Sequence, residues 1–301
     1  MKFRFFCGIA VLMGALAACS PAALAGESHE HRMEFHAHDR SYLIYRPASL
    51  DKDKAVPLVI VLHGGFGSGA QAEKSYGWDE EADAKGFVVA YPDGVRHSWN
   101  AGGACCGRAR RDDVDDVGFL NALIDRVVHV ENIDPKRVYM TGMSNGAAMA
   151  YRYACEGSFS VAAFGSVSGD MTASCPHPRA VSLMEIHGLA DRNIPFKGGR
   201  GSKGVTHIDW PPVAQTVGIF RRAGECTAPA TSTKGPVKTE MSACKGGREV
   251  VLTTIADAGH QWPGGHEHSM IGRMLLRLDP PSRALDATSV LWNFFAGHKA
   301  P

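Results

Sequence analysis

The chain has 301 residues, of which 45% are hydrophobic and 21% charged, and 32 Lys and Arg against 31 Asp and Glu give a formal net charge of +1. This balance excludes a nucleic-acid-coating protein, an acidic disordered tail and a polytopic membrane protein. The length suffices for one large domain or two small ones with a buried core. Eight cysteines are too many for a typical cytosolic enzyme and too few for a disulfide miniprotein.

Residues 1–25 have the pattern of an export signal. Lys2 and Arg4 precede an apolar run at 5–16, which is shorter than the roughly 20 residues of a membrane-spanning helix. Two cleavage sites fit: a lipobox-like sequence at 16–19, which would give Cys19 a lipid anchor and which we favour, and an ordinary signal-peptidase site after Ala25. We therefore expect a periplasmic or extracellular protein, with an outer-membrane lipoprotein as the anchored form.

After a polar lead-in at 26–40 with four histidines, short apolar runs alternate with longer amphipathic stretches. Strands are predicted at 41–46, 58–62, 87–91, 137–141, 163–167, 183–186 and 249–255, and helices at 115–130, 145–154, 211–223 and 287–295. This alternation predicts an α/β fold with a mostly parallel sheet and helices on both faces, in a single domain over 41–298. The polar stretch at 227–247 is expected to be an insertion before the last strand rather than a second domain.

Export places the cysteines in an oxidising compartment. Without Cys7 and Cys19, which belong to the signal, six cysteines remain, and this even number predicts three disulfides. The six are Cys105, Cys106, Cys155, Cys175, Cys226 and Cys244. Cys226 is expected to pair with Cys244, and Cys105 and Cys106 with Cys155 and Cys175 in either order. A zinc site is the alternative, but the chain contains no C-x2-C pair to support it.

A nucleophile elbow is predicted at Gly142-Met143-Ser144-Asn145-Gly146, which follows an expected strand and precedes an expected helix. In this G-x-S-x-G pattern the small flanking residues permit a strained turn that exposes the serine hydroxyl. Ser144 is therefore the predicted nucleophile.

A serine nucleophile needs a histidine base and a carboxylate that orients it, here in the order serine, acid, histidine. Asp191 follows the strand at 183–186, and His260 follows the last strand. Asp209 and Asp257 are rival acids, but neither follows a strand of its own. We therefore predict a triad of Ser144, Asp191 and His260.

Backbone N–H groups should stabilise the oxyanion of the tetrahedral intermediate. Asn145 supplies one donor, because it follows the nucleophile. The second is expected from the glycine-rich turn at His63-Gly64-Gly65. Either Gly65 or Phe66 is the donor there.

Eight blocks of the chain resemble the polyhydroxybutyrate depolymerase family of esterases, which adjoins the feruloyl and acetylxylan esterases of carbohydrate esterase family 1. The blocks are Leu62-His63-Gly64-Gly65, Tyr91-Pro92-Asp93-Gly94, Ser98-Trp99-Asn100-Ala101-Gly102, Cys105-Cys106-Gly107, Val114-Asp115-Asp116-Val117-Gly118-Phe119, the elbow, His187-Gly188 with Asp191, and Gly259-His260-Gln261-Trp262-Pro263-Gly264-Gly265. The resemblance runs from about residue 42 to 295. It implies an α/β-hydrolase fold and the same three triad residues.

The resemblance also suggests how substrate binds. Trp99 and Trp262 fall in matching blocks and are candidates for stacking on a planar or hydrophobic acyl group, although both could equally be core residues. No cofactor is expected. Asp115 and Asp116 fit a helix N-terminus without a metal, and only adventitious metal binding is expected at residues 266–268.

The sequence thus predicts an exported, monomeric serine esterase acting on polyhydroxybutyrate-type polyester or its oligomers. Depolymerases of insoluble polymer usually append a substrate-binding domain, and the chain ends soon after its last helix, which favours soluble oligomers. Feruloyl or acetylxylan esters are the alternative substrates. A non-catalytic envelope-binding lipoprotein on the same scaffold is the alternative of another class. No nucleic-acid partner is expected.

Overall fold

The computed structural model describes residues 25–36, 38–204, 208–267, 270–276 and 278–301. The predicted export signal, including the lipobox-like sequence and Cys19, lies outside these residues except for Ala25. Among the described residues, no helix is both long enough and apolar enough to span a membrane.

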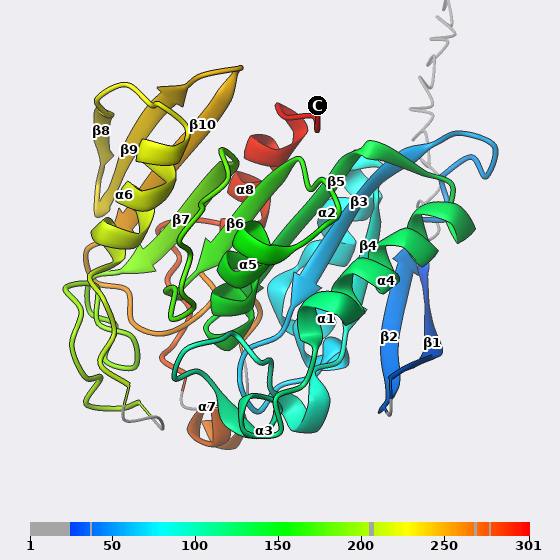
Figure 1. Cartoon of the computed structure of the whole chain (residues 1–301), viewed down its shortest axis with the longest axis horizontal. Coiled ribbons are helices and arrows are strands. Elements are labelled where there is room, and N and C mark those ends of the chain that lie inside the picture. Colours follow the sequence, from blue (N-terminus) through cyan, green and yellow to red (C-terminus); the bar gives the residue numbers. More distant parts are fainter. Residues whose placement is uncertain (1–24, 37, 205–207, 268–269, 277) are drawn as a thin grey trace, which may run out of the picture.

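The ten strands of the described residues form one sheet, in the order β1-β2-β4-β3-β5-β6-β7-β10-β9-β8 (Figure 1). Strands β4, β3, β5, β6, β7 and β10 are parallel, whereas β1, β2, β9 and β8 are antiparallel to their neighbours. The bounds are β1 (Glu27–Phe35), β2 (His38–Arg46), β3 (Val56–Leu62), β4 (Val88–Pro92), β5 (Ile133–Met143), β6 (Ala163–Val167), β7 (Ser182–Gly188), β8 (Ala230–Lys234), β9 (Val237–Cys244) and β10 (Arg248–Ile255).

Helices cover both faces of this sheet, and Figure 1 shows α4, α5 and α6 in front of it and α8 behind. One core cluster joins the front face to α4, α5 and α6, and the other joins the back face to α1, α2 and α8. The helices are α1 (Gly69–Tyr76), α2 (Trp78–Lys85), the 3-10 turn η1 (Val95–His97), α3 (Gly107–Arg111), α4 (Asp116–Val130), α5 (Asn145–Glu156), α6 (Val213–Ala223), α7 (Met270–Leu276) and α8 (Ala287–Ala296). The predicted α/β-hydrolase fold, with a mostly parallel sheet and helices on both faces, is confirmed.

The sheet is wider than the sequence predicted. The polar lead-in is largely strand β1, and most of the polar insertion is the β8–β9 hairpin, so both extend the sheet at its edges. These edge strands are mostly exposed and polar, and therefore lack the apolar runs that identified the inner strands. The helices α1, α2, α3 and α7 were also missed, because each has only five to eight residues.

The cysteine pairing was predicted correctly in one case and wrongly in two. Cys226 pairs with Cys244 as expected. Cys105 and Cys106, however, pair with each other, and Cys155 pairs with Cys175 across a Cα–Cα distance of 5.8 Å.

The length of α5 explains why the predicted pairing fails. Cys105 Sγ lies 3.6 Å from the side-chain amide of Asn145, at the start of α5, whereas Cys155 is in its last turn. Ten residues of α-helix span about 15 Å, which is more than twice the usual Cα separation of a disulfide.

The parallel register brings several strand ends to one edge of the sheet. Leu62 of β3 pairs with Gly142 of β5, and Gly188 of β7 pairs with Ile255 of β10. The loops after β3, β5, β7 and β10 therefore emerge together, and they carry Gly65, Ser144, Asp191 and His260.

Candidate active site

Ser144 occupies a strained turn between β5 and α5, with φ 55° and ψ −116°. Its two flanking glycines are sterically required. A Cβ on Gly146 would lie 2.4 Å from the carbonyl oxygen of Leu62, and one on Gly142 would lie 2.5 Å from the backbone of Gly146. The G-x-S-x-G pattern is thus explained by contact between the elbow, β3 and the first turn of α5.

The structure brings Ser144, His260 and Asp191 into one chain of hydrogen bonds. The Ser144 hydroxyl lies 2.9 Å from His260 Nε2, and His260 Nδ1 lies 2.7 Å from Asp191 Oδ2. His260 and Asp191 are 3% and 4% exposed, whereas Ser144 is only partly buried. The rival acids Asp209 and Asp257 are both exposed. This arrangement can transfer a proton from the serine to the histidine while the carboxylate fixes the ring.

Asp191 is held as a carboxylate. Its Oδ1 accepts hydrogen bonds from the backbone N–H groups of Asn193 and Ile194, at 2.7 and 2.9 Å. Burial raises the pKa of Asp191, but the charge and hydrogen bond of His260, the charge of His187 and the Ile194 N–H outweigh it, so the net shift is downward. The group therefore stays ionised and faces the histidine ring.

A second histidine–carboxylate pair, which sequence reasoning missed, lies behind Asp191. His187 Nδ1 donates to Glu185 Oε1 at 2.8 Å and Nε2 donates to the Ile194 carbonyl at 2.9 Å, and both side chains are fully buried. Burial lowers the pKa of His187, but contact with Glu185 raises it more, to about 9, and burial raises the pKa of Glu185. His187 therefore stays protonated at neutral pH. Its Nε2 lies 3.7 Å from Asp191 Oδ2. His187 stands in a block quoted for the resemblance, but nothing in its pattern indicated this role.

The backbone of His260 is fixed by a residue that the sequence did not single out. Asp279 Oδ2 accepts the His260 N–H at 2.9 Å, and its Oδ1 accepts from Lys203 at 2.7 Å. A Cβ on Gly259 would lie 2.2 Å from the same carboxylate, so this glycine lets Asp279 approach.

The two candidate donors in the glycine-rich turn differ. The Phe66 N–H already donates to the His97 carbonyl at 2.8 Å, whereas the N–H groups of Gly65 and Asn145 have no acceptor among the described residues. Gly65, Asn145 and Ser144 line one cavity. Gly65 is thus the residue of this turn whose N–H can donate a hydrogen bond to an oxyanion.

The interpretation of Trp99 and Trp262 as stacking platforms is wrong, because both are buried in the core. Trp99 is 0% exposed, and its indole donates to the His63 carbonyl at 3.0 Å. The Asn145 side chain forms two hydrogen bonds with the Trp99 backbone: it accepts from the N–H at 2.7 Å and donates to the carbonyl at 3.0 Å. Trp262 is 4% exposed and stacks on Tyr76 at 4.4 Å.

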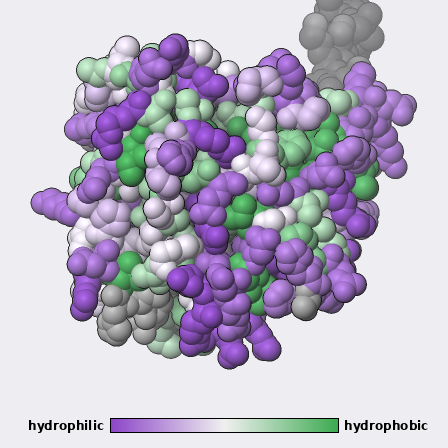
Figure 2. Space-filling view, in the orientation of Figure 1, coloured by the Kyte–Doolittle hydropathy of each residue, from purple (hydrophilic) through white to green (hydrophobic). Residues whose placement is uncertain are grey.

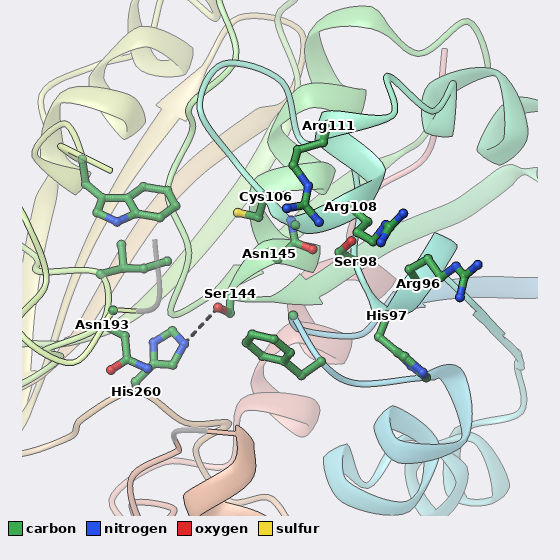
Figure 3. Close-up of a pocket in the computed structure, with 16 residues that line it drawn as sticks. Arg96, His97, Ser98, Cys106, Arg108, Arg111, Ser144, Asn145, Asn193 and His260 are labelled. Carbon is green, nitrogen blue, oxygen red and sulfur yellow. Dashed lines mark hydrogen bonds between the residues drawn. The ribbon is translucent and has the colours of Figure 1, made fainter. Parts of the chain in front are cut away.

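Ser144 opens into a cavity of about 330 Å³ whose two sides differ (Figure 3). The histidine side, as we name it, consists of Asn193, Ile194, Trp210 and His260, and the arginine side consists of Arg96, His97, Arg108 and Arg111. No sequence motif indicated these arginines, nor Trp210, which is the tryptophan that does line the cavity. The exposed side chain of Phe66 also lines it.

The described residues contain no cluster of three or more metal-ligating side chains. Asp115 caps α4 by accepting the Gly118 N–H, and Asp116 is buried in an ion pair with Arg40 at 2.8 Å. His266 hydrogen-bonds to the Lys74 carbonyl, and His268 lies outside the described residues.

The chain is similar in sequence to known esterases. A family model described as "Esterase PHB depolymerase" matches residues 40–197, which is more than half of the chain. "Putative esterase NocK" of Nocardia uniformis subsp. tsuyamanensis is 32% identical over 253 residues, which cover 76% of this chain and 73% of that protein. Feruloyl esterase B of Piromyces equi is 28% identical, and the match covers 73% of this chain but only 42% of that relative's length.

A solved structure supports the fold independently. The acetyl xylan esterase from Aspergillus awamori superposes with a TM-score of 0.57 at 14% identity, covering 83% of this chain and 99% of that one. The family model and the sequence relatives show a carboxylic ester hydrolase of the serine type, and the solved structure shows the same fold. The chain therefore belongs to the esterase family described as PHB depolymerase.

Proposed function

We propose that the protein hydrolyses carboxylic esters through a Ser144–His260–Asp191 triad and an acyl-enzyme. The observation that carries this proposal is the continuous hydrogen-bond chain from the Ser144 hydroxyl through His260 to Asp191. His260 Nε2 takes the hydroxyl proton while Ser144 Oγ attacks the ester carbonyl carbon. The same nitrogen then protonates the leaving alcohol.

Deacylation uses the same groups in reverse. His260 removes a proton from water, the hydroxide attacks the acyl carbonyl, and the proton returns to Ser144 Oγ as the carboxylic acid leaves. The free N–H groups of Gly65 and Asn145 stabilise the oxyanion in both steps. Asp191 holds the imidazole with Nε2 facing the serine and stabilises the imidazolium.

The proposed substrates are soluble polyhydroxybutyrate-type oligomers. The family described as PHB depolymerase supports this choice, as does an open cavity large enough for a short acyl chain with part of its alcohol. Feruloyl or acetyl esters of plant-wall polysaccharide are the second candidate. The relatives named feruloyl esterase favour it, and the exposed ring of Phe66, which lines the cavity, offers a surface on which an aromatic ring can stack.

We also propose that the protein is exported. Three disulfides among the described residues support an oxidising compartment. Palmitate labelling of the expressing cells distinguishes a Cys19 lipoprotein, which becomes labelled, from a chain cleaved after Ala25, which does not.

The central experiment compares p-nitrophenyl butyrate hydrolysis by the wild type, Ser144→Ala and the control Ser232→Ala, whose serine is exposed on β8. The first variant should lose at least about a thousandfold in kcat and the control nothing. Equal rates for wild type and Ser144→Ala would overturn the triad and favour the non-catalytic alternative. Assays on a hydroxybutyrate dimer, methyl ferulate and acetylated xylan then rank the substrates.

A further inference from the structure

The arginine side gives the cavity a strong positive character that the net charge of the chain conceals. Three arginines are among its sixteen lining residues, and none of the sixteen is Asp or Glu. The whole chain carries a net charge of only +1. A cleft lined by one sign of charge concentrates ligands of the opposite sign.

Two of these three arginines have no ion-pair partner among the described residues. Arg96 and Arg111 are exposed and form no ion pair with any described residue. Arg108 has one partner, Asp112, at 3.7 Å in an exposed pair. Like charges gathered without counterions repel one another, and an anionic ligand would relieve that repulsion.

The segment that carries Arg108 and Arg111 is held in place by the rest of the site. The disulfide between Cys105 and Cys106 precedes α3, and Cys105 contacts the Asn145 side chain. The Ala109 N–H donates to the Ser98 hydroxyl at 3.2 Å. This α3 segment is therefore fixed to the residue that follows the nucleophile, which reduces the entropy lost when a ligand binds.

The three arginine side chains differ in the direction in which they point. Figure 3 shows Arg111 directed toward Asn145 and Cys106, whereas the guanidinium groups of Arg96 and Arg108 point away from Ser144. Figure 2 shows hydrophilic side chains gathered at the lower edge of the molecule, where Figure 1 places α3. Arg111 is thus the inner cation, and the other two extend the positive surface outward.

We propose that the arginine side is a carboxylate subsite and that the preferred substrates are esters bearing a carboxylate near the scissile bond. This inference rests on the proposed ester hydrolysis and narrows its substrate class. Guanidinium groups bind carboxylates through paired hydrogen bonds. A linear hydroxybutyrate oligomer ends in such a carboxylate, whereas a feruloyl or acetyl ester of a neutral polysaccharide carries none.

The test uses two pairs of esters that differ in charge. Mono-p-nitrophenyl glutarate against p-nitrophenyl valerate places the carboxylate in the acyl part. The 3-hydroxybutyrate dimer against its terminal amide places it in the alcohol part. The ratio of kcat/KM, charged over neutral, is measured for each pair after subtraction of the enzyme-free rate.

The variants are Arg111→Gln, the double variant Arg96→Gln/Arg111→Gln, and the control Arg222→Gln, whose arginine is exposed on α6 and does not line the cavity. In one of the two pairs, Arg111→Gln should lower the ratio roughly fivefold and the double variant roughly tenfold or more. The pair that responds shows whether the acyl part or the alcohol part of the substrate carries the carboxylate. The control should leave both ratios unchanged. Circular dichroism verifies that each variant is folded.

Two results would overturn the subsite: ratios in the double variant equal to those of the wild type in both pairs, or a wild type that hydrolyses both neutral esters but neither charged one. Neither result affects the triad, which fails only if Ser144→Ala retains activity. Salt gives a second readout. Raising NaCl from about 0.05 M to about 0.5 M should reduce kcat/KM for the charged ester more than for its neutral partner.

Discussion

The two sides of the cavity differ in whether their charged side chains are buried and paired. On the histidine side, His260 is buried, as are Asp191, His187 and Glu185 behind it, and each of these four groups has a hydrogen-bond partner. On the arginine side, Arg96 and Arg111 are exposed and have no ion-pair partner among the described residues. Both sides contact the nucleophile elbow. Ser144 hydrogen-bonds to His260 on the histidine side, and the Asn145 side chain hydrogen-bonds to the Trp99 backbone in the segment that leads to the arginine side.

This difference assigns proton transfer to the histidine side and substrate selection to the arginine side. Buried and paired charges are fixed in position and interact strongly, as proton transfer requires. Exposed charges act over a longer range and are screened by salt, as recognition of a diffusing anion requires. Changes on the histidine side should therefore reduce the rate for every ester, whereas changes on the arginine side should alter the preference between esters.

The largest effect is expected from Asp191→Asn. An amide in place of the carboxylate would no longer accept the Nδ1–H of His260 reliably, so the ring would adopt the wrong tautomer and kcat should fall by about 10³–10⁴ for charged and neutral esters alike. Stopped assays with p-nitrophenyl butyrate measure this. Asp209→Asn and Asp257→Asn, which change the exposed acids, serve as matched controls, and near-full activity of Asp191→Asn would instead direct attention to Asp257.

The next largest effect is expected from Glu185→Gln, which acts through His187. Without the carboxylate, His187 loses the contact that keeps it protonated, and Asp191 loses a cation 3.7 Å away. The pKa of Asp191 should then rise, kcat should fall about 10- to 100-fold, and the acid limb of the pH profile should move to higher pH. Glu225→Gln, at an exposed acid, is the control. A lower rate with an unmoved acid limb would show only a structural role for Glu185.

The same buried pair predicts a pH dependence of folding. Burial lowers the pKa of His187, but Glu185 raises it more, to about 9, which lies above the ordinary value of 6.5. The stabilisation is therefore complete below about pH 6.5 and is lost as the pH rises through about 9. Urea unfolding of the wild type and His187→Gln, with disulfides intact, should show their difference in unfolding free energy shrink by about 2 kcal/mol between pH 7 and pH 10. A constant difference would contradict a proton held by this pair.

The smallest effect is expected on the arginine side, from Asp112→Asn. This change removes the only ion-pair partner of Arg108 among the described residues. The preference for a carboxylate ester over its neutral partner should rise about twofold, because an exposed pair is worth less than about 1 kcal/mol. Asp125→Asn, at an exposed acid on α4, should change nothing. A fall in the preference after Asp112→Asn would show that Arg108 does not contribute to the subsite.

The inner part of the fold was predictable from the sequence because its signals are local. Continuous apolar runs identified the strands covered on both faces, and β6 was predicted with the observed bounds. The outer strands β1, β8 and β9 were not, since they lack continuous apolar runs and form by pairing with neighbouring strands. The short helices α1 and α2 pack on the back face of the sheet, and they are too short to show the periodic apolar pattern that predicts a helix.

The position of the nucleophile elbow, and the loops that carry Asp191 and His260, were predictable from the amino-acid sequence alone. The reason is that parallel strands end at one edge of the sheet, so that position after a strand fixes position in space. Features that depend on which loops meet are apparent only in the folded chain. The folded structure pairs Cys105 with Cys106, bonds the Phe66 N–H to the His97 carbonyl while the Gly65 N–H stays free, and buries Trp99 and Trp262. It also gathered three arginines beside Ser144 in a chain of nearly zero net charge, because a total says nothing about where charges lie.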